Sequence, residues 1–204
     1  MFLTIFIILI HELGHAITAS MLNLRVKEVT IYMFGGVTVL EENLNSNIYK
    51  EIIMILMGPI VQVLFLLFIY KLNRVGYVND LTYNKFYNIN IILLSFNLLP
   101  ILPLDGGKLV NNIFDLLVPF NLSHLISIVI SYITLPLIFR IDNKLFMLLI
   151  FIFLNIKLYE EIKNHKYRLN KLILERKIKD YNFKRIKYID NIKQIKRNEG
   201  YILN

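Results

Sequence analysis

Long apolar runs alternate with shorter polar segments along the whole chain. The runs predict five helices, at residues 2–22, 49–72, 87–99, 122–139 and 144–159. A helix needs about 20 mostly apolar residues to cross the hydrocarbon core of a bilayer. Because several of the runs meet that length, we predict an all-α polytopic membrane protein with about five transmembrane helices.

Two interruptions of this pattern add detail. Residues 24–47 are more polar, and Val, Thr and Ile are interleaved there on either side of a glycine pair at 35–36. This pattern predicts a small β-hairpin after the first helix. The third run is broken at Pro100 and Pro103, and the apolar stretch 109–118 that follows is too short to span alone. We predict a broken helix of the kind that lines a cavity at membrane depth.

The composition supports this class and narrows the chemistry. Hydrophobic residues make up 56% of the 204 positions, and the mean hydropathy is +0.54. There is no cysteine, which excludes a disulfide framework and thiolate metal sites. Any metal must be held by His and carboxylate side chains, and four His are too few for an enzyme built on several histidine boxes. The first run lacks a basic start and a small-residue cleavage site, so no cleavable signal peptide is expected.

The net charge of +8 lies at the C-terminal end. Residues 157–204 hold 14 Lys and Arg against 6 Asp and Glu, and the preceding residues hold 9 of each sign. We therefore predict a membrane-embedded domain at 1–159 and a basic amphipathic tail at 160–204, helical at first. The positive-inside rule predicts a cytoplasmic tail. Its expected partner is anionic lipid and not nucleic acid, because it follows a membrane helix.

The first apolar run contains ionisable residues in one short motif, HELGH at 11–15. His11 and His15 are four residues apart, so they share a helix face and can bind one Zn²⁺. Glu12 lies about 100° around the helix from His11 and can act as a general base toward water. Ionisable groups in a membrane helix are costly and by default functional. Gly14 is predicted to let another helix approach closely.

A catalytic zinc usually has three protein ligands and one open position. His124 is expected at the membrane interface and His165 in solvent, so neither is the predicted third ligand. Asp105 follows the helix-breaking prolines and precedes two glycines. Alone it fits a helix N-cap equally well, but beside HExxH it is the predicted ligand. Asn97 is predicted to donate to the substrate carbonyl or its oxyanion, the other interpretation being an interhelical hydrogen bond.

Several motifs together resemble the site-2 intramembrane metalloproteases, in particular the stage IV sporulation protein FB group. They are HELGH at 11–15, FGG at 34–36, GP at 58–59, FYN at 86–88, NLLPILPLDGGK at 97–108 and LILER at 172–176. The resemblance covers nearly the whole chain. It implies a zinc protease with ligands His11, His15 and Asp105, with Glu12 activating water and Asn97 orienting or stabilising the substrate.

The resemblance also implies a substrate and partners. The β-prone segment 26–40 would hold an extended substrate strand by edge pairing, with contacts at Phe34, Gly35, Gly36 and Val37. The implied substrate is the membrane-associated pro-sequence of the sporulation sigma factor pro-sigma-K, at the outer forespore membrane. Members of this group are held inactive by inhibitory membrane protein partners.

Two alternatives stay open. A site-2 protease could act on another substrate, such as an anti-sigma factor or a signal peptide. A non-catalytic metal-binding membrane protein or transporter would need polar residues on several helices, whereas 122–139 and 144–159 are nearly purely apolar.

The chain also departs from the group in two places. Family members carry a transmembrane helix before HELGH, so we expect either an upstream start or a dispensable first helix. The group often has a C-terminal CBS domain, which leaves control by nucleotide open here.

Overall fold

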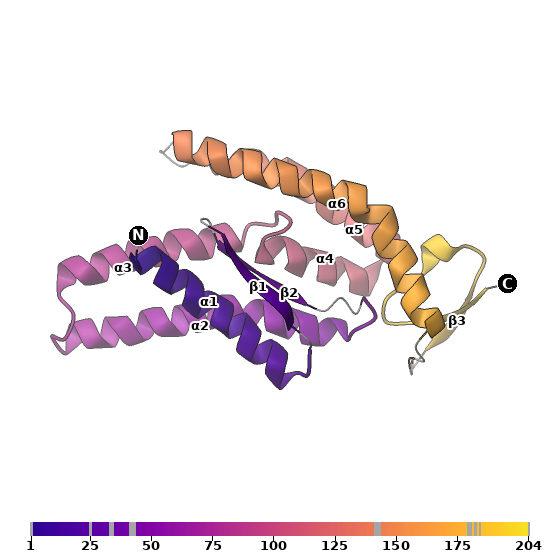
Figure 1. Cartoon of the computed structure of the whole chain (residues 1–204), viewed down its shortest axis with the longest axis horizontal. Helices are drawn as coiled ribbons and strands as arrows, with labels where there is room; N and C mark the ends of the chain where they lie inside the picture. Colours follow the sequence, from indigo (N-terminus) through magenta and orange to yellow (C-terminus); the bar gives the residue numbers. More distant parts are fainter. Residues whose placement is uncertain are drawn as a thin grey trace. The chain divides into compact units, whose positions relative to one another are not determined.

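The computed structural model describes residues 2–24, 26–32, 35–40, 44–140, 144–178, 181, 183 and 185–203. The chain divides into two compact units. The first comprises Met1–Glu41 and Ile53–Leu98, and the second comprises Glu42–Ile52 and Leu99–Asn204. The elements of both units are labelled in Figure 1.

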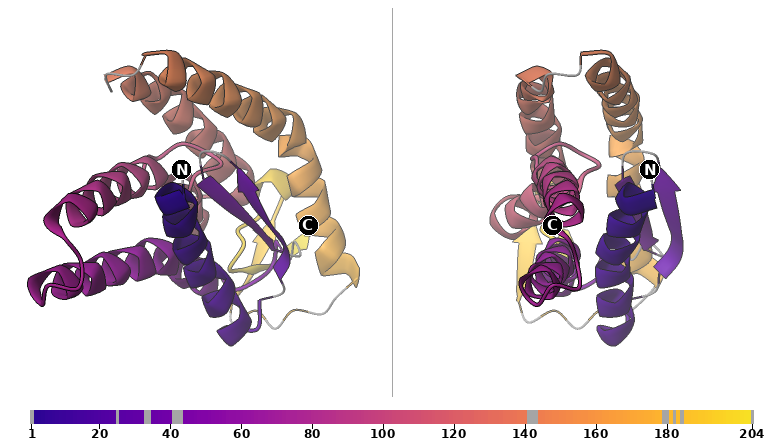
Figure 2. Two further views of the ribbon diagram at one scale, coloured as in Figure 1. Left: turned by 60° about the vertical axis from the view of Figure 1, so that its left-hand side comes forward. Right: turned by 90° about the vertical axis from the view of Figure 1, so that its left-hand side faces the viewer.

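The first unit is built from three helices and a hairpin. Its elements are α1 (Phe2–Met21), β1 (Val26–Tyr32), β2 (Gly35–Leu40), the greater part of α2 (Ile48–Arg74) and α3 (Asp80–Asn97). Strands β1 and β2 pair antiparallel, with Ile31 opposite Gly36, which confirms the predicted hairpin. The hairpin contacts α1, as Figure 2 shows.

Aromatic packing joins the three helices of this unit. The ring of Phe65 on α2 lies 5.6 Å from the ring of Phe6 on α1 and 5.6 Å from that of Phe86 on α3. Helix α3 begins seven residues before the predicted start at 87, because Asn79 accepts a hydrogen bond from the Thr82 amide and caps it. Helices α1, α2 and α3 thus share one apolar packing centre.

The second unit contains the remaining elements. They are α4 (Asp105–Leu117), α5 (Phe120–Thr134), η1 (Leu135–Arg140), α6 (Lys144–Ile178), β3 (Ile186–Ile189), η2 (Ile192–Gln194) and β4 (Gly200–Leu203). Helix α6 packs along α5 (Figure 2). A buried cluster of Phe120, Leu172, Ile189 and Ile195 attaches the C-terminal segment to both helices.

The predicted break in the helix that carries the second motif is present. Helix α3 ends at Asn97, and α4 begins at Asp105 with Leu104 as its N-cap. A Cβ atom on Gly107 would lie 2.4 Å from the carbonyl carbon of Ile101, so the turn can fold against α4 only if position 107 is glycine. The Leu102 amide donates to Ser131 Oγ on α5 and fixes this turn.

The C-terminal segment differs from the predicted helical tail. Helix α6 continues without a break from Lys144 to Ile178, through the predicted boundary at 159. Strands β3 and β4 then pair in parallel, a sheet that the all-α prediction lacks. The tail predicted to be helical at first is therefore helical as far as Ile178, and Tyr181 among the described residues beyond it is not helical.

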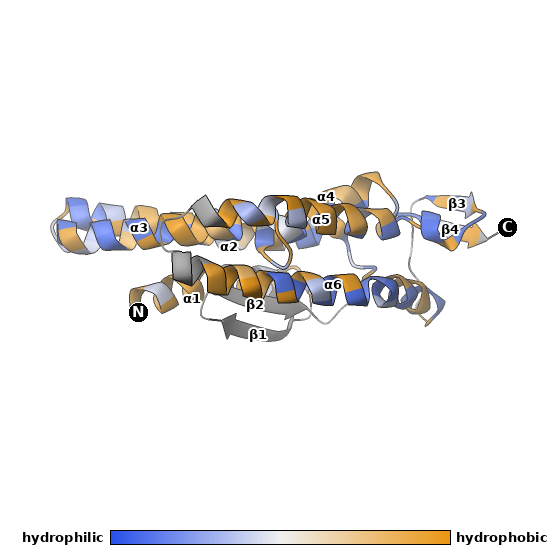
Figure 3. Cartoon of the chain, turned by 90° about the horizontal axis from the view of Figure 1, so that it is seen from above, coloured by the Kyte–Doolittle hydropathy of each residue, from blue (hydrophilic) through white to orange (hydrophobic). Residues whose placement is uncertain are grey.

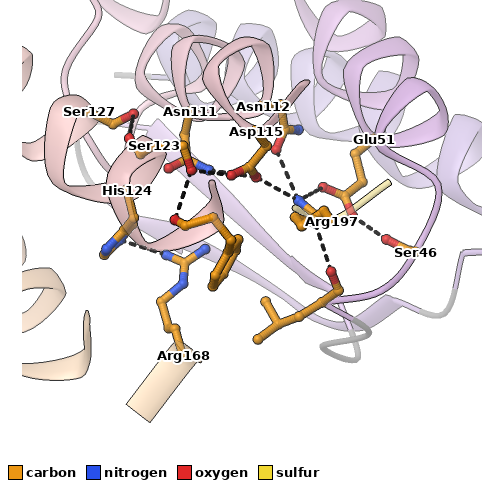
Figure 4. A network of polar contacts seen from close by, with 12 residues as sticks. Ser46, Glu51, Asn111, Asn112, Asp115, Ser123, His124, Ser127, Arg168 and Arg197 are labelled. Atoms are coloured by element: carbon orange, nitrogen blue, oxygen red, sulfur yellow. Dashed lines mark hydrogen bonds and ion pairs between the residues drawn. The ribbon is translucent and has the colours of Figure 1, made fainter. Parts of the chain in front are cut away.

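Arg197 links this segment through polar contacts to the rest of the second unit (Figure 4). Its guanidinium is buried, donates to the Asp115 carboxylate at 3.0 Å and to the Leu44 carbonyl at 2.7 Å, and forms an ion pair with Glu51. Ser123 donates to the other oxygen of Asp115. Glu51, in the first turn of α2, thus neutralises a cation from near the end of the chain.

Three helices are long and apolar enough to cross a membrane. They are Phe2–Met21, Ile48–Arg74 and Phe120–Ile138. Figure 3 shows apolar residues along most of α2 and α5, and polar residues on the last turns of α6. The prediction of an integral membrane protein is supported, and three of its five spans are confirmed by length and composition within the part of the chain that the structure describes.

Candidate metal centre

Helix α1 places the HExxH residues on its buried side. His11, Glu12 and His15 are 2%, 4% and 3% exposed, although Leu13 between them is open to the surroundings. The 3.6-residue period of the helix brings the two imidazoles together, with ring centroids 4.7 Å apart. A membrane helix thus buries two imidazoles and a carboxylate in one place.

The proton of His15 is fixed by a main-chain carbonyl. Nδ1 of His15 lies 2.9 Å from the carbonyl oxygen of Met54 on α2. Because a carbonyl oxygen can only accept, Nδ1 carries the hydrogen. The neutral ring then has a lone pair on Nε2, the form that binds metal ions.

His11 is fixed in the same tautomer through a side chain. Nδ1 of His11 lies 2.9 Å from Gln62 Oε1. On the other side of the amide, Gln62 Nε2 donates to the carbonyl oxygen and to Oδ1 of Asn90, each at 3.1 Å. The Asn90 carbonyl requires a donor, so the amide nitrogen must face Asn90 and the amide oxygen must face His11. His11 therefore also carries its lone pair on Nε2.

The two lone pairs face a common point. Nε2 of His11 and Nε2 of His15 are 3.1 Å apart. Two nitrogens bound to one tetrahedral zinc at about 2.0–2.1 Å stand about 3.3 Å apart. Neutral rings whose protons are both on Nδ1 have no hydrogen to share between these atoms, so a cation fits there. The pair supplies two of the nitrogen ligands that zinc prefers.

Asn97 joins this group from the last turn of α3. Its Nδ2 lies 3.4 Å from His11 Nε2, and its side chain is buried. The amide is therefore next to the point at which the two lone pairs converge. The predicted residues His11, Glu12, His15 and Asn97 are brought together within the first unit.

Two glycines allow α1 and α2 to meet at this point. A Cβ atom on Gly14 would lie 2.7 Å from the Met57 carbonyl oxygen and 3.0 Å from Gly58 Cα. The close approach that was predicted for Gly14 is confirmed. A Cβ atom on Gly58 would lie 2.2 Å from His15 Nε2, so the imidazole fills the space that a side chain would need.

Known metalloproteases resemble this chain in sequence. Residues 1–82 match the model of peptidase family M50. The chain is 34% identical over 175 residues to stage IV sporulation protein FB of Bacillus subtilis (strain 168). The aligned region covers 83% of this chain and 61% of that relative. The N-terminal part of the chain, residues 1–82, is therefore similar to peptidase family M50.

Other relatives are more distant. The chain is 24% identical over 119 residues to zinc metalloprotease MJ0392 of Methanocaldococcus jannaschii. The aligned region covers 56% of this chain and 34% of that protein. The solved structure of the site-2 protease from the same organism matches with a TM-score of 0.63 at 19% identity, over 78% of this chain and 76% of that one, and shows the same fold. The chain thus spans about three fifths of the length of its sporulation relative.

The remaining predicted site residues belong to other elements of the chain. Asp105 is the first residue of α4 in the second unit, is buried, and has an oxygen 3.6 Å from Lys108 Nζ. Gly35, Gly36 and Val37 form the first half of β2. Phe34 lies outside the described residues. Their roles as ligand and as substrate contacts remain predictions.

The other two histidines contact each other, and the expectation that His165 is an ordinary solvated residue is wrong. His124 is buried, and its Nδ1 lies 2.8 Å from His165 Nδ1, with the two rings stacked. His165 is therefore not an ordinary solvated side chain. Glu161 and Arg168 complete the group around His124. The contact is missing from the prediction because 41 residues separate the two histidines in sequence.

Sequence reasoning missed Gln62 and Asn90. Gln62 is the one strongly polar side chain in the apolar run that follows Gly58-Pro59. A polar residue facing the interior of a membrane bundle is a functional signal, and that signal could have identified it. Asn90 carries no comparable signal, because polar residues surround it in sequence.

Proposed function

We propose that this protein is a zinc metalloendopeptidase of the M50 type that hydrolyses a peptide bond of a membrane-associated protein. The observation that carries the proposal is that Nε2 of His11 and Nε2 of His15, which both carry a lone pair, lie 3.1 Å apart beside the buried Glu12. Asp105 completes the ligand set, and one Zn²⁺ binds per chain. When bound, the ion polarises the scissile carbonyl and acidifies the attacking water.

The protein groups then have distinct tasks. Glu12 accepts a proton from the attacking water and passes it to the leaving amine nitrogen, so that hydrolysis ends with a new carboxyl and a new amino terminus. The Asn97 amide donates to the carbonyl oxygen as negative charge develops there. The buried setting strengthens both interactions because water is excluded from the helix interface.

The hairpin is the proposed docking site for the substrate. A peptide bond in a helix is shielded by its own hydrogen bonds, so the substrate must be extended near the scissile bond. A strand edge of the hairpin can pair with such an extended segment through main-chain hydrogen bonds. The proposed substrate contacts are Phe34, Gly35, Gly36 and Val37. Side-chain pockets then decide which sequence is cut.

Pro-sigma-K is the proposed substrate, because of the 34% identity to stage IV sporulation protein FB over most of this chain. The proposal includes the outer forespore membrane as location, a cytoplasmic C-terminus and control by inhibitory membrane proteins. The surplus of basic residues after residue 157 further favours contact with anionic lipid.

Co-expression tests the proposal. The chain is produced with pro-sigma-K from its own source, and wild type is compared with Glu12→Gln, which removes the base and keeps the size of the side chain. We expect a shortened sigma factor only with wild type. Cleavage by both proteins would overturn the role of Glu12. Cleavage by neither, with zinc bound to wild type, would overturn pro-sigma-K as substrate.

A further inference from the structure

A polar chain lies behind His11 in the otherwise apolar interior of the first unit. Gln62 on α2 is 1% exposed and Asn90 on α3 is fully buried. The order of hydrogen bonds is His11 Nδ1 to Gln62 Oε1, then Gln62 Nε2 to the carbonyl oxygen and Oδ1 of Asn90. Buried polar groups among apolar side chains reduce stability unless they are paired. The two residues therefore need a reason to be there.

We propose that Gln62 is a positioning residue for the metal ligand His11, and that Asn90 fixes the direction of the Gln62 amide. The inference rests on the proposed function. A glutamine amide can face either way. With the nitrogen toward His11, Nδ1 would have to accept, the ring proton would move to Nε2, and the lone pair would leave the metal site. Asn90 removes this alternative by placing two oxygens against Gln62 Nε2.

The Asn90 side chain supports a functional reading. Its Nδ2 is buried and has no hydrogen-bond partner among the described residues. A buried donor without a partner lowers stability relative to an apolar residue of similar size. The Asn90 side chain thus accepts a hydrogen bond from Gln62 through its oxygen, while its own amide nitrogen makes none among the described residues. An arrangement that served stability alone would use an apolar side chain here.

The two positions differ in how much they should matter. Gln62 contacts His11 Nδ1 directly, through its side-chain oxygen at 2.9 Å. Asn90 offers two acceptors, and its carbonyl oxygen remains whatever side chain is present. Loss of the Gln62 amide should therefore weaken metal binding strongly, and loss of the Asn90 side chain only slightly.

The experiment measures zinc affinity in the detergent-solubilised full chain by competition with a chromogenic chelator. We expect Gln62→Met, which keeps the length and lacks the acceptor, to lower the affinity 10- to 100-fold. Gln62→Glu should stay within about tenfold of wild type, because a neutral carboxylic acid can accept from His11 and donate to Asn90. Asn155→Leu, which removes a hydrogen bond confined to α6, is the control and should leave the affinity unchanged.

Two further readouts separate positioning from a merely structural role. Asn90→Leu should lower zinc affinity up to about tenfold while the Tm of the metal-free protein stays the same or rises. The visible absorption of the Co²⁺-loaded protein should change with Gln62→Met and recover with Gln62→Glu. A structural role would instead move the affinity and the metal-free Tm in the same direction.

The outcomes distinguish this inference from the proposed function. If wild type binds zinc and Gln62→Met binds it equally well, the positioning role is overturned while the protease proposal stands. If wild type binds no zinc, the proposed function itself fails. If Gln62→Met does not fold, the opposite responses of affinity and Tm in Asn90→Leu decide, and an unchanged affinity there with unchanged Co²⁺ absorption overturns the inference.

Discussion

The imidazole of His15 occupies the space that a side chain at Gly58 would fill. A Cβ atom at position 58 would lie 2.2 Å from Nε2 and 2.4 Å from Cε1 of that ring. The glycine of the GP motif is thus required by the His15 imidazole on the neighbouring helix, and not only by helix packing.

Gly58→Ala should therefore displace the His15 ring. We expect zinc affinity and cleavage to fall at least tenfold, because the methyl group and Nε2 cannot occupy the same place. Zinc content after dialysis and cleavage of the co-expressed substrate measure the two effects. Gly76→Ala is the matched control: its Cβ atom meets nothing within 4 Å, and the positive φ of 89° affects stability alone. Equal zinc content in both variants would contradict the steric argument.

Replacement of Asp105 tests the third ligand. Asp105→Asn keeps the size of the side chain and removes the charge, so we expect zinc affinity to drop by 10-fold or more and cleavage to cease. A zinc chelator should have the same effect on wild type, and added Zn²⁺ should restore activity. Asp80→Asn, at the exposed start of α3, should change neither property. A variant at 105 that bound zinc as wild type does would remove Asp105 from the ligand set.

Loss of Arg197 should detach the C-terminal segment. Arg197→Met would leave the carboxylate of Asp115 buried without its cation, and breaking a buried ion pair in this way costs about 3–5 kcal/mol. We expect a lower Tm and faster trypsin cleavage within residues 185–203. Lys193→Met removes an exposed cation of the same segment and should behave as wild type. An unchanged Tm in Arg197→Met would mean that apolar contacts alone hold the segment.

Acid should weaken the group around His124 through Glu161. Burial would raise the pKa of Glu161, but the hydrogen bond with His124 and the charge of Arg168 lower it to about 2. A depressed carboxylate pKa stabilises the folded state above the ordinary value of 4.5, and this stabilisation is lost as the pH falls toward 2.

The Tm of wild type should consequently fall more steeply between pH 4.5 and 2 than that of Glu161→Gln. Glu160→Gln, which removes only the exposed ion pair with Lys157, should follow the wild-type curve. His165 faces the same group, and burial, followed by the charges of His124 and Arg168, lowers its pKa. Parallel curves for all three proteins would exclude Glu161 as the source of the dependence.

Local patterns gave the parts of the site that depend on one helix. The spacing of His11 and His15, the glycine pair at 35–36 and the break before Asp105 are each readable from neighbouring residues. The partners of the histidines are not, because Gln62 lies 51 residues from His11 and Met54 contributes only its main chain. The β3–β4 pair was missed for a related reason. Its strands are four residues long and depend on contacts with α5 and α6 that the tail sequence does not reveal.

The main-chain carbonyl of Asn90 has an evolutionary consequence. Substitution cannot remove a carbonyl oxygen, so the acceptor that orients Gln62 persists through any change of side chain at position 90. Substitution at position 90 should therefore have little effect on the tautomer of His11, and we expect relatives to tolerate apolar residues there. At position 62 no main-chain group replaces the side chain, because the hydrogen bond from His11 Nδ1 requires a side chain of this length with an acceptor atom. Selection on this part of the bundle should therefore act far more strongly on the second transmembrane helix than on the helix that supports it.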